Sequence, residues 1–503
     1  PINATFSVLP TTADTIVDVL RQWTTRKPKE NDNADAHETH SITQEITWRT
    51  EQIYRLAQIR HQNWPKAPSD KPTKQETDER YENYIKEIEP ELDHNEEQIR
   101  EWLELNQDAP LISIIIPTYN TNSNHLRECI ESVCRQSYPN WELCICDDSS
   151  SAVSVKTILR SYQSSDPRVK LIFREKNGHI CEASNDALRM ATGEYVALLD
   201  HDDILADNAL YWVARELQKK PQANLIYSDE DKVNDDGMRA CPHFKPAFNI
   251  DLLLSYNFIS HLGVYRREIL KQIGGFRVGF EGSQDHDLAL RTVLESSPDQ
   301  IIHIPRVLYH WRAHSESTAS NPDSKDYTTE SGHKAVQHFL DEQHRRGGVR
   351  ATARIKAKNR FTCQWHIPEK SPSVELIIPT RDQAEVLNLA VDSIITKTTY
   401  TNYTITVVDN QSEEVATKNL FKNLKRVHGE KINIIKYNKK FNYSAINNYA
   451  VRKSKADIVA LVNNDVEVIS SKWLQEIVSH TSRPDVGCVG AKLYYSNGTI
   501  QHG

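Results

Sequence analysis

The stretch LISIIIPTYN, residues 111–120, decides the fold because the chain contains a second version of it. The second version is VELIIPTRD, residues 374–382. Each apolar run ends in Pro-Thr, and each proline precedes an acid or amide, Asp148 or Asn410, by 31 positions. A short apolar run bounded by turn residues is typical of a buried strand. The chain therefore repeats at least one strand together with the segment that follows it.

Each copy continues into a further apolar run that ends in acids or amides. These runs are VALLDHDD, residues 196–203, and IVALVNND, residues 458–465. Between the first and the last apolar run of each copy, the spacing of apolar residues changes to that of amphipathic helices. One such helix is expected at His125–Gln136. Strands alternating with helices predict a mainly parallel sheet covered on both faces, with ligands bound at the carboxyl ends of its strands. The repeat therefore predicts two Rossmann-like α/β domains, each with a ligand site.

Composition limits the classes of function. The 503 residues carry a net charge of −8, with an isoelectric point near 6.2, which argues against nucleic-acid binding. The sequence shows no run of 18 apolar residues and no signal peptide, so we expect a cytoplasmic protein with at most peripheral membrane association. Cys144 and Cys146 alternate as buried strand residues would, and no Cys-x-x-Cys pair occurs. Because the chain does not begin with Met, we expect it to be a piece of a longer protein.

Four segments follow from these patterns. Residues 1–108 are rich in Glu, Lys, Asn and Gln and predict a helical, partly disordered extension. Residues 109–320 contain the first copy, and residues 321–372 predict a helix and a connector. Residues 373–503 contain the second copy. That copy ends before any counterpart of residues 280–312, so we expect only part of a domain there.

Three acids, Asp200, Asp202 and Asp203, follow the apolar run at residues 196–199. Carboxylate oxygens suit hard cations, and Mg²⁺ usually takes one or two carboxylates together with substrate phosphates. An acidic, solvated turn would look the same, because Asp is common after strands. Polar residues at other strand ends of this copy favour a ligand crevice: PTYN at 117–120, Asp147-Asp148 and Asn177-Gly178.

Together these stretches resemble the inverting nucleotide-sugar glycosyltransferases of family 2, which have the GT-A fold. The resemblance extends over roughly residues 80–503. Within the family, the chain most resembles the tandem, rhamnosyltransferase-like bacterial proteins that build O-antigen and other surface polysaccharides. It implies two tandem GT-A domains after a helical extension, the second incomplete and consisting of the nucleotide-binding half only. The matching segments are 111–120, 141–149, 177–185, 193–203, 227–232, 274–291 and 307–312, and in the second copy 377–382, 407–412, 441–448 and 461–467.

The resemblance implies a donor site at the strand ends of the first copy. Asp200 would face the ribose or the diphosphate, and Asp202 would bind Mg²⁺ or Mn²⁺. His310 would be a further metal ligand, although a single His beside Trp311 often belongs to the core instead. The residues implied for the donor nucleotide are Pro117, Tyr119, Asn120, Asp147, Asp148, Asn177 and Asp200.

The segment FEGSQDHD, residues 280–287, is implied to carry the general base. Asp285 matches the acid that takes the proton of the acceptor hydroxyl, which permits direct displacement with inversion. Asp285 could instead cap the helix expected at Asp287–Glu295, but Asp287 could cap that helix equally well. The residues expected on the acceptor side are Glu281, Gln284 and Trp311. Residues 227–232 could line the acceptor cleft or form an exposed turn.

The sequence departs from the family pattern at His179, where relatives often carry a second glycine after Asn-Gly. The second copy departs further, because Asn463-Asn464-Asp465 stands where the first copy has Asp-x-Asp-Asp. Its candidate ligand residues are Pro379, Asp409, Asn463 and Asp465. Without an acceptor half, the second copy is expected to fold but not to transfer sugar.

The predicted function is sugar transfer from a UDP- or dTDP-linked donor to a glycan or lipid-linked glycan acceptor. The alternative is a non-catalytic scaffold that binds nucleotides or glycans in a polysaccharide-assembly complex, which the degenerate second copy fits. A nucleotidyltransferase also places acids at strand ends. It would usually carry a Gly-rich, basic phosphate loop near the first strand, and residues 117–124 have neither feature.

Overall fold

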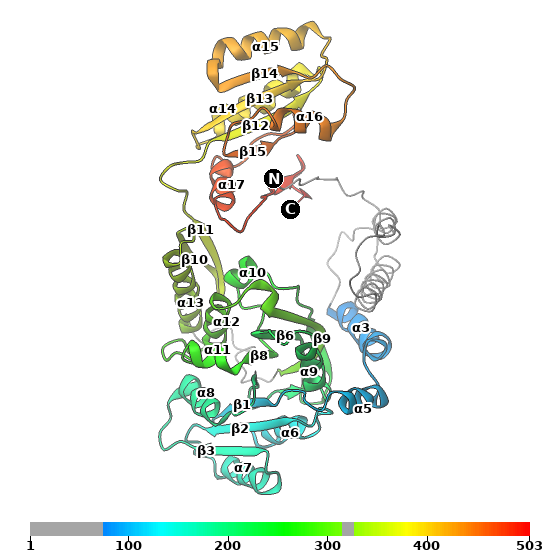
Figure 1. The fold of residues 1–503 in the computed structure, drawn as a ribbon, viewed down its shortest axis with the longest axis vertical. Helices are drawn as coiled ribbons and strands as arrows, with labels where there is room; N and C mark the ends of the chain where they lie inside the picture. Colours follow the sequence, from blue (N-terminus) through cyan, green and yellow to red (C-terminus); the bar gives the residue numbers. More distant parts are fainter. Residues whose placement is uncertain (1–73, 314–325, 503) are drawn as a thin grey trace, which may run out of the picture. The chain divides into compact units, whose positions relative to one another are not determined.

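The computed structural model describes residues 74–313 and 326–502. The chain divides into two compact units between Thr77 and Asp78, and the second unit contains both sheets of Figure 1. The disorder expected in part of the extension concerns residues 25–72, which lie outside the described residues.

The first sheet begins with four parallel strands, two of which contain the apolar runs at residues 111–116 and 196–199, and then continues into strands that the sequence did not predict. The strand order is β3-β2-β1-β4-β8-β6-β9-β5, with β7 beside β6. Strand β8 runs antiparallel to β4 and to β6. The bounds are β1 Ile112–Thr118, β2 Trp141–Asp147, β3 Val169–Phe173, β4 Tyr195–Leu198, β5 Ile204–Leu205, β6 Leu225–Val233, β7 Arg239–His243, β8 Gly263–Arg266 and β9 Ile301–Arg312.

Helices cover both faces of this sheet. Ile112 and Ile114 of β1 pack with one group of helices, α6, α7 and α9, whereas Ile115 packs with α8, α10 and α12 on the other face. Burial on both faces is why β1 reads as a continuous apolar run instead of an alternating one. The bounds are α6 Ser123–Cys134, α7 Val153–Ser165, α8 His179–Met190, α9 Ala209–Lys219, α10 Ile250–Ser255, α11 Arg267–Gln272, α12 Gln284–Leu294 and the 3-10 turn η2 Pro298–Gln300.

The described end of the N-terminal extension is helical and packs on the first sheet domain. Tyr81 is buried, and its hydroxyl donates to Asp231 Oδ2 at 2.6 Å. Trp212 Nε1 donates to Asp93 Oδ1 at 2.7 Å. These contacts make the helices part of the domain surface, whereas the sequence suggested exposed helices. The bounds are α3 Lys74–Asn83, the π-helix η1 Tyr84–Ile88, α4 Glu89–Leu92 and α5 Glu96–Leu105.

The segment expected to be a helix and a connector contains a β-hairpin as well. Helix α13, Asp326–Arg345, is followed by the antiparallel strands β10, Ala351–Ala357, and β11, Arg360–Trp365. Phe339 and Phe361 share the core that contains Leu288 of α12. The hairpin therefore belongs to the first sheet domain. Sequence patterns did not predict this, because they assigned the segment to a connector.

The second sheet has four parallel strands in the order β14-β13-β12-β15. Its register repeats that of the first sheet, since Val374 pairs with Ile458 as Ile112 pairs with Tyr195. The bounds are β12 Val374–Thr380, α14 Ala384–Lys397, β13 Tyr403–Asp409, α15 Val415–His428, η3 Gly429–Lys431, β14 Ile432–Lys436, α16 Tyr443–Val451, β15 Ile458–Leu461, α17 Trp473–Thr481, β16 Leu493–Tyr494 and β17 Ile500–His502.

The prediction of a mixed α/β fold with two mainly parallel sheets is confirmed. Within the described ranges, every helix is too short or too polar to cross a bilayer.

Candidate active site

The carboxyl ends of β1, β2 and β4 open into a cavity of about 940 Å³. The first sheet domain supplies its walls from segments far apart in sequence, as parallel sheets do at their ligand ends. The polar and aromatic lining residues include Tyr119, Asp148, Asn177, His179, Asp200, His201, Glu230, His243, Tyr256, Asn257, His261, Glu281, Gln284, Asp285, Trp311, Tyr327, Lys358, Asn359 and Arg360.

Five of the residues implied for the donor nucleotide line this cavity at the strand ends: Pro117, Tyr119, Asp148, Asn177 and Asp200. Tyr119 is 49 % exposed, so its ring is available to a ligand. Asp148 Oδ1 accepts the Gly178 N–H and lies 2.9 Å from Arg174 Nε. These contacts fix the carboxylate between two strand ends.

Two other residues implied for the donor hold the turns of the site and do not line the cavity. Asn120 Oδ1 accepts the backbone N–H of Ser151 at 2.9 Å. Asp147 is fully buried, and its Oδ2 accepts the Ser150 N–H at 3.1 Å. Asp147 Oδ1 has no hydrogen-bond partner among the described residues. The structure therefore brings Asp148 into the cavity but turns Asp147 inward.

His179 has a φ of 62°, in the left-handed region that favours glycine. This backbone conformation explains why a glycine would suit the position and why the departure from the family pattern carries strain. The His179 side chain lines the cavity. The residue thus adds an imidazole where a glycine would leave open space.

The three acids after β4 have different surroundings. Asp200 lines the cavity, whereas Asp203 is buried and accepts both the Tyr309 hydroxyl at 2.5 Å and the Arg312 N–H at 2.7 Å. Burial and the Asp200 charge raise the pKa of Asp203 well above its usual value. Asp202 is partly buried, and its carbonyl oxygen accepts Arg312 Nε at 2.8 Å.

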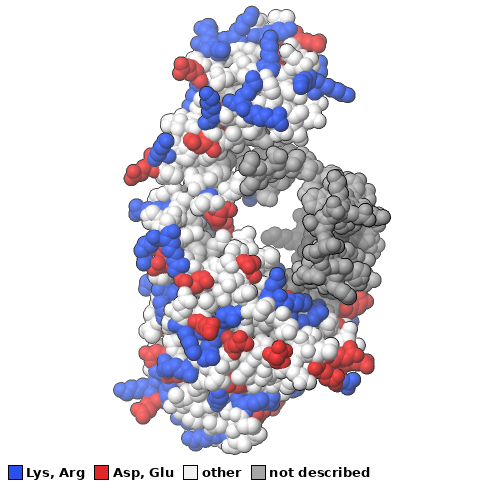
Figure 2. All heavy atoms as spheres, viewed as in Figure 1, with Lys and Arg blue, Asp and Glu red and all other residues white. Residues whose placement is uncertain are grey.

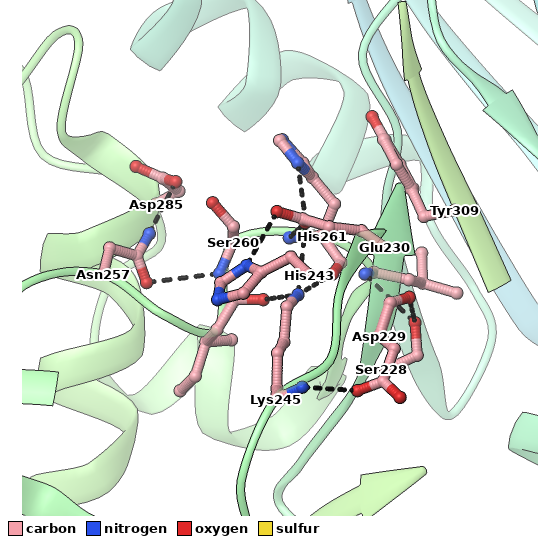
Figure 3. Close-up of polar contacts among 12 residues, drawn as sticks. Ser228, Asp229, Glu230, His243, Lys245, Asn257, Ser260, His261, Asp285 and Tyr309 are labelled. Carbon is pink, nitrogen blue, oxygen red and sulfur yellow. Dashed lines mark hydrogen bonds and ion pairs between the residues drawn. The ribbon is translucent and has the colours of Figure 1, made fainter. Parts of the chain in front are cut away.

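His261 contacts two acids of the site, Asp200 and Glu230, and Figure 3 shows it beside Glu230. Its Nε2 lies 3.7 Å from Asp200 Oδ2, and its Nδ1 lies 3.2 Å from Glu230 Oε2. The ring stacks on Tyr309 at 4.5 Å between centroids. Although burial opposes protonation, the two carboxylates raise the pKa of His261 well above its usual value. His261 therefore links the acid at the end of β4 to the acid on β6.

Glu230 continues this network away from the cavity. Its Oε2 lies 3.2 Å from the fully buried Lys245 Nζ, which also donates to the Ile259 carbonyl at 2.7 Å. Although burial opposes ionisation, the Lys245 charge and hydrogen bonds from His243 and His261 lower the pKa of Glu230 well below its usual value. The segment 227–232 is therefore a buried strand with one acid in the cavity, and not an exposed turn.

A metal ion would find oxygen and imidazole ligands here. Ligand atoms of Asp200, Asp203 and His261 lie within 4.8 Å of one another. Carboxylates with one imidazole suit Mn²⁺, and carboxylates with substrate phosphates suit Mg²⁺. This cluster differs from the pair implied by the family resemblance, Asp202 and His310. Two of its members, Asp200 and Asp203, belong to the acidic motif after β4.

His310 lies on the face of β9 opposite to Tyr309 and Trp311, since side chains alternate along a strand. Its Nδ1 contacts Asp231 Oδ1 at 2.6 Å, and the other Asp231 oxygen accepts the Tyr81 hydroxyl. The structure thus ties His310 to the N-terminal helices. It brings Trp311, but not His310, into the cavity lining.

Asp285 lies in the first turn of α12 and faces the cavity (Figure 3). Its Oδ2 accepts Asn257 Nδ2 at 2.7 Å, and its Oδ1 accepts the His286 N–H at 2.8 Å. The helix begins after Ser283, and the alternative of a capping role for Asp285 or Asp287 is wrong. Asp287 is instead buried between Arg277 and Arg291.

The other residues expected on the acceptor side, Glu281 and Gln284, line the cavity with Asp285. The Glu281 carboxylate accepts the Gly279 N–H, and Gln284 Oε1 accepts the Gly282 N–H. Sequence reasoning missed Asn257, His261 and the hairpin residues 358–361. No motif identifies them, because each depends on a tertiary contact.

The second copy repeats the strand ends without a comparable set of acids. Asp409 Oδ1 accepts the Ser412 N–H at 2.9 Å, so Asp409 holds a turn. Asn463 Oδ1 accepts the Tyr443 hydroxyl at 3.4 Å, and Asp465 is exposed. Pro379 is the last residue but one of β12, as Pro117 is of β1.

Comparison with known proteins identifies the family. The family model described as glycosyl transferase family 2 matches residues 113–274 and 375–502, so the chain belongs to this family. Both sheet domains are thus matched, each over its parallel strands.

Two curated relatives are similar over most of the chain. An uncharacterised protein of Sinorhizobium fredii is 45% identical over 405 residues, which cover 79% of this chain and 43% of the relative. The O-antigen biosynthesis protein RfbC of Myxococcus xanthus is 35% identical over 393 residues, 78% of this chain and 30% of the relative. The chain spans less than half the length of either relative.

Among solved structures, S. aureus TarS in complex with UDP-GlcNAc overlaps 46% of this chain and 72% of its own, at 20% sequence identity and a TM-score of 0.37. An overlap of this size adds nothing to the assignment made from the sequence family.

Proposed function

We propose that the first sheet domain transfers a sugar from a nucleotide-sugar donor to a glycan acceptor with inversion, using Mg²⁺ or Mn²⁺. The observation that carries this proposal is that Asp200 and Asp285, 85 positions apart in sequence, line one recess together with Pro117. A single-displacement transfer needs the donor site and the general base on the same reacting carbon, and the shared recess supports that arrangement.

In this proposal Tyr119 and Asp148 hold the nucleoside, and Asp200 faces the ribose or diphosphate. Asp202, or the cluster of Asp200, Asp203 and His261, would hold the metal. When bound, the metal offsets the charge that develops on the leaving nucleoside diphosphate. His261 lies beside Asp200 on the same side of the cavity.

Asp285 is the proposed general base. Each of its oxygens accepts one hydrogen bond, which leaves lone pairs for the acceptor hydroxyl. The base takes the hydroxyl proton, the oxygen forms the new bond to the anomeric carbon, and the bond to the diphosphate breaks on the opposite face. Asn257 positions the carboxylate by donating to Oδ2.

The proposed donor is UDP- or dTDP-linked, and the proposed acceptor is a glycan or lipid-linked glycan of a bacterial surface polysaccharide. We place the reaction in the cytoplasm, with at most peripheral membrane association. Similarity to the O-antigen protein RfbC supports the acceptor class. The test is a screen of nucleotide sugars for Mn²⁺-dependent hydrolysis and transfer by the purified chain. If no donor is hydrolysed or transferred faster by the wild type than by Asp285→Asn, the proposal is wrong.

A scaffold function is proposed for the second sheet domain alone, because Asn410 and Asn463 replace the acids Asp148 and Asp200. An amide cannot supply the charge that a metal–diphosphate site needs. Calorimetry with UDP and Mn²⁺ on the chain with Asp202→Ala would reveal a second nucleotide site if one binds.

A further inference from the structure

Among the described residues, the only lysine and arginine side chains that line the cavity are Lys358, in the β10–β11 turn, and Arg360, the first residue of β11. The remaining charged lining residues are acids, Asp148, Asp200, Glu230, Glu281 and Asp285, with histidines between them. A turn outside the strands and helices of the repeat thus supplies the strong cations of an otherwise acidic cavity.

This turn is held in place by contacts on both sides. Asn359 has a φ of 51° and accepts the Thr328 and Thr329 hydroxyls through Oδ1, each at 3.1 Å. The neighbouring Phe361 is buried and packs near His286 of α12. The two cations therefore stand on a fixed loop, and not on a freely moving one.

Arg360 also has a defined side-chain position. Its guanidinium lies 3.9 Å from the centroid of the Tyr256 ring. Tyr256 precedes Asn257, which donates to Asp285. The stacked guanidinium keeps its N–H edge available for an oxyanion, and it lies on the side of the cavity that holds the proposed base.

Charge pairing distinguishes Arg360 from the other cations around the cavity. Lys245 pairs with Glu230, Arg174 with Asp148, and Arg291 with Asp287. Within residues 74–313 and 326–502, no carboxylate forms an ion pair with Arg360. The protein thus neutralises its nearby cations internally and leaves this one facing the cavity.

We propose that Lys358 and Arg360 form a subsite for an oxyanion on the acceptor, either a sugar carboxylate or the phosphate of a lipid-linked glycan. A planar guanidinium beside an ammonium binds either group through charge-assisted hydrogen bonds. The inference rests on the proposed function, because it takes the Asp285 side of the cavity as the acceptor side. It adds that the acceptor is charged.

The test measures probe binding to the full chain by calorimetry, which does not depend on turnover. Two matched probe pairs are used: a hexuronate-containing tetrasaccharide with its carboxyl-reduced counterpart, and a short-chain prenyl diphosphate-linked GlcNAc with an alkyl GlcNAc that lacks the diphosphate. One anionic probe should bind roughly tenfold or more tightly than its neutral partner. Added salt should reduce this difference in affinity, called the affinity gap. Which pair shows the affinity gap identifies the source of the oxyanion.

The variant Lys358→Gln with Arg360→Gln should close the affinity gap while the affinity for UDP and Mn²⁺ stays unchanged. The matched control is Arg354→Gln with Lys356→Gln, two exposed cations of β10 that do not line the cavity. The proposal is overturned if the wild type binds neither anionic probe better than its partner, or if the control closes the affinity gap equally.

Loss of UDP affinity in the turn variant would also overturn it, since the cations would then serve the donor. Donor hydrolysis by the wild type tests the proposed function separately. If the chain hydrolyses its donor through Asp285 but shows no preference for anionic probes, the subsite proposal is wrong and the proposed function stands.

Discussion

Asn120 Oδ1 in the first sheet domain accepts the Ser151 N–H at 2.9 Å, and Asp382 Oδ1 in the second accepts the Glu413 N–H at 2.8 Å. Both residues have positive φ, 47° and 53°. The side chains that shape the turns after the first strand are therefore retained in both copies, while the side chains that face a ligand are not.

The retained contacts extend to the second strand of each copy. Asp147 holds the Ser150 N–H and Asp409 holds the Ser412 N–H. The acid next to Asp147 is Asp148, which lines the cavity, but its counterpart next to Asp409 is the amide Asn410, whose Nδ2 donates to the Tyr437 carbonyl at 2.9 Å. The amide has become part of the loop structure.

The two copies also differ at the strand that carries the acidic motif. β4 pairs with β1 and β8, whereas β15 pairs with β12 alone among the described strands. Leu461 is 48 % exposed, and basic side chains are the commoner charge over the second sheet domain on the face shown in Figure 2. The two copies thus share the turns that hold the parallel strands and differ in the acids and in the strands beside them.

The largest effect is expected from Asp202→Ala, which should abolish metal-dependent donor binding. Removing this carboxylate takes away an oxygen ligand that the diphosphate cannot replace. Calorimetry with UDP and Mn²⁺ measures the change. The matched control is Asp465→Ala in the second copy, which should leave the affinity unchanged. Unchanged affinity in Asp202→Ala would assign the metal to Asp200, Asp203 and His261 instead.

Asp285→Asn should keep donor binding but lower transfer by roughly 10²–10⁴-fold, because the amide keeps the shape and removes the proton acceptor. The rate constant for transfer at saturating donor checks this. Asn257→Ala should have a smaller effect on the same rate constant, since it removes only the hydrogen bond that positions Asp285. Near wild-type transfer by Asp285→Asn would exclude Asp285 as the base.

The parallel strands and the strand-end motifs were predictable from the sequence, because buried strands and turn residues leave local signals. β1 through β4 lie where the apolar runs are, and Asp148, Asp200 and Asp285 all reach one cavity. The antiparallel strands, His261 and the β10–β11 turn were not predictable. Their positions depend on contacts between segments that are distant in sequence.

His310 shows that a motif position alone does not tell whether a side chain faces the cavity. The motif position suggested a metal ligand, but which face of a strand a residue occupies depends on register, and a shift of one residue reverses it. In the structure Tyr309 contacts Asp203 while His310 contacts Asp231.

A smaller effect is expected when the equivalent valines of β4, an inner strand, and β15, an edge strand, are compared. Val196 of β4 is fully buried, and Val459 of β15, its counterpart by register, is partly exposed. Val196→Ala should lower the free energy of local opening by about 2–3 kcal/mol, and Val459→Ala by less than about 1 kcal/mol. Hydrogen exchange of the two strands measures both. Equal losses would mean that the two strands are equally well packed.

The smallest effect is expected from Asp465→Ala in a chain whose first copy is already inactivated by Asp202→Ala and Asp285→Asn. That chain should show no transfer, and the third substitution should change nothing. The second sheet domain has its core, with Leu376 and Ile405 fully buried, so it should remain folded. Asp465 is exposed at its strand end, and Asn463 stands where Asp200 would face a ribose or diphosphate.

What the second copy lacks, within the described residues, is a base positioned as Asp285 is by Asn257. A nucleotide site without a positioned base does not activate a hydroxyl. Circular dichroism before and after the substitutions establishes that the fold is intact. Residual transfer that disappears with Asp465→Ala would show that the second copy is itself active. The two copies would then differ in the rate of transfer, and not in whether they transfer sugar.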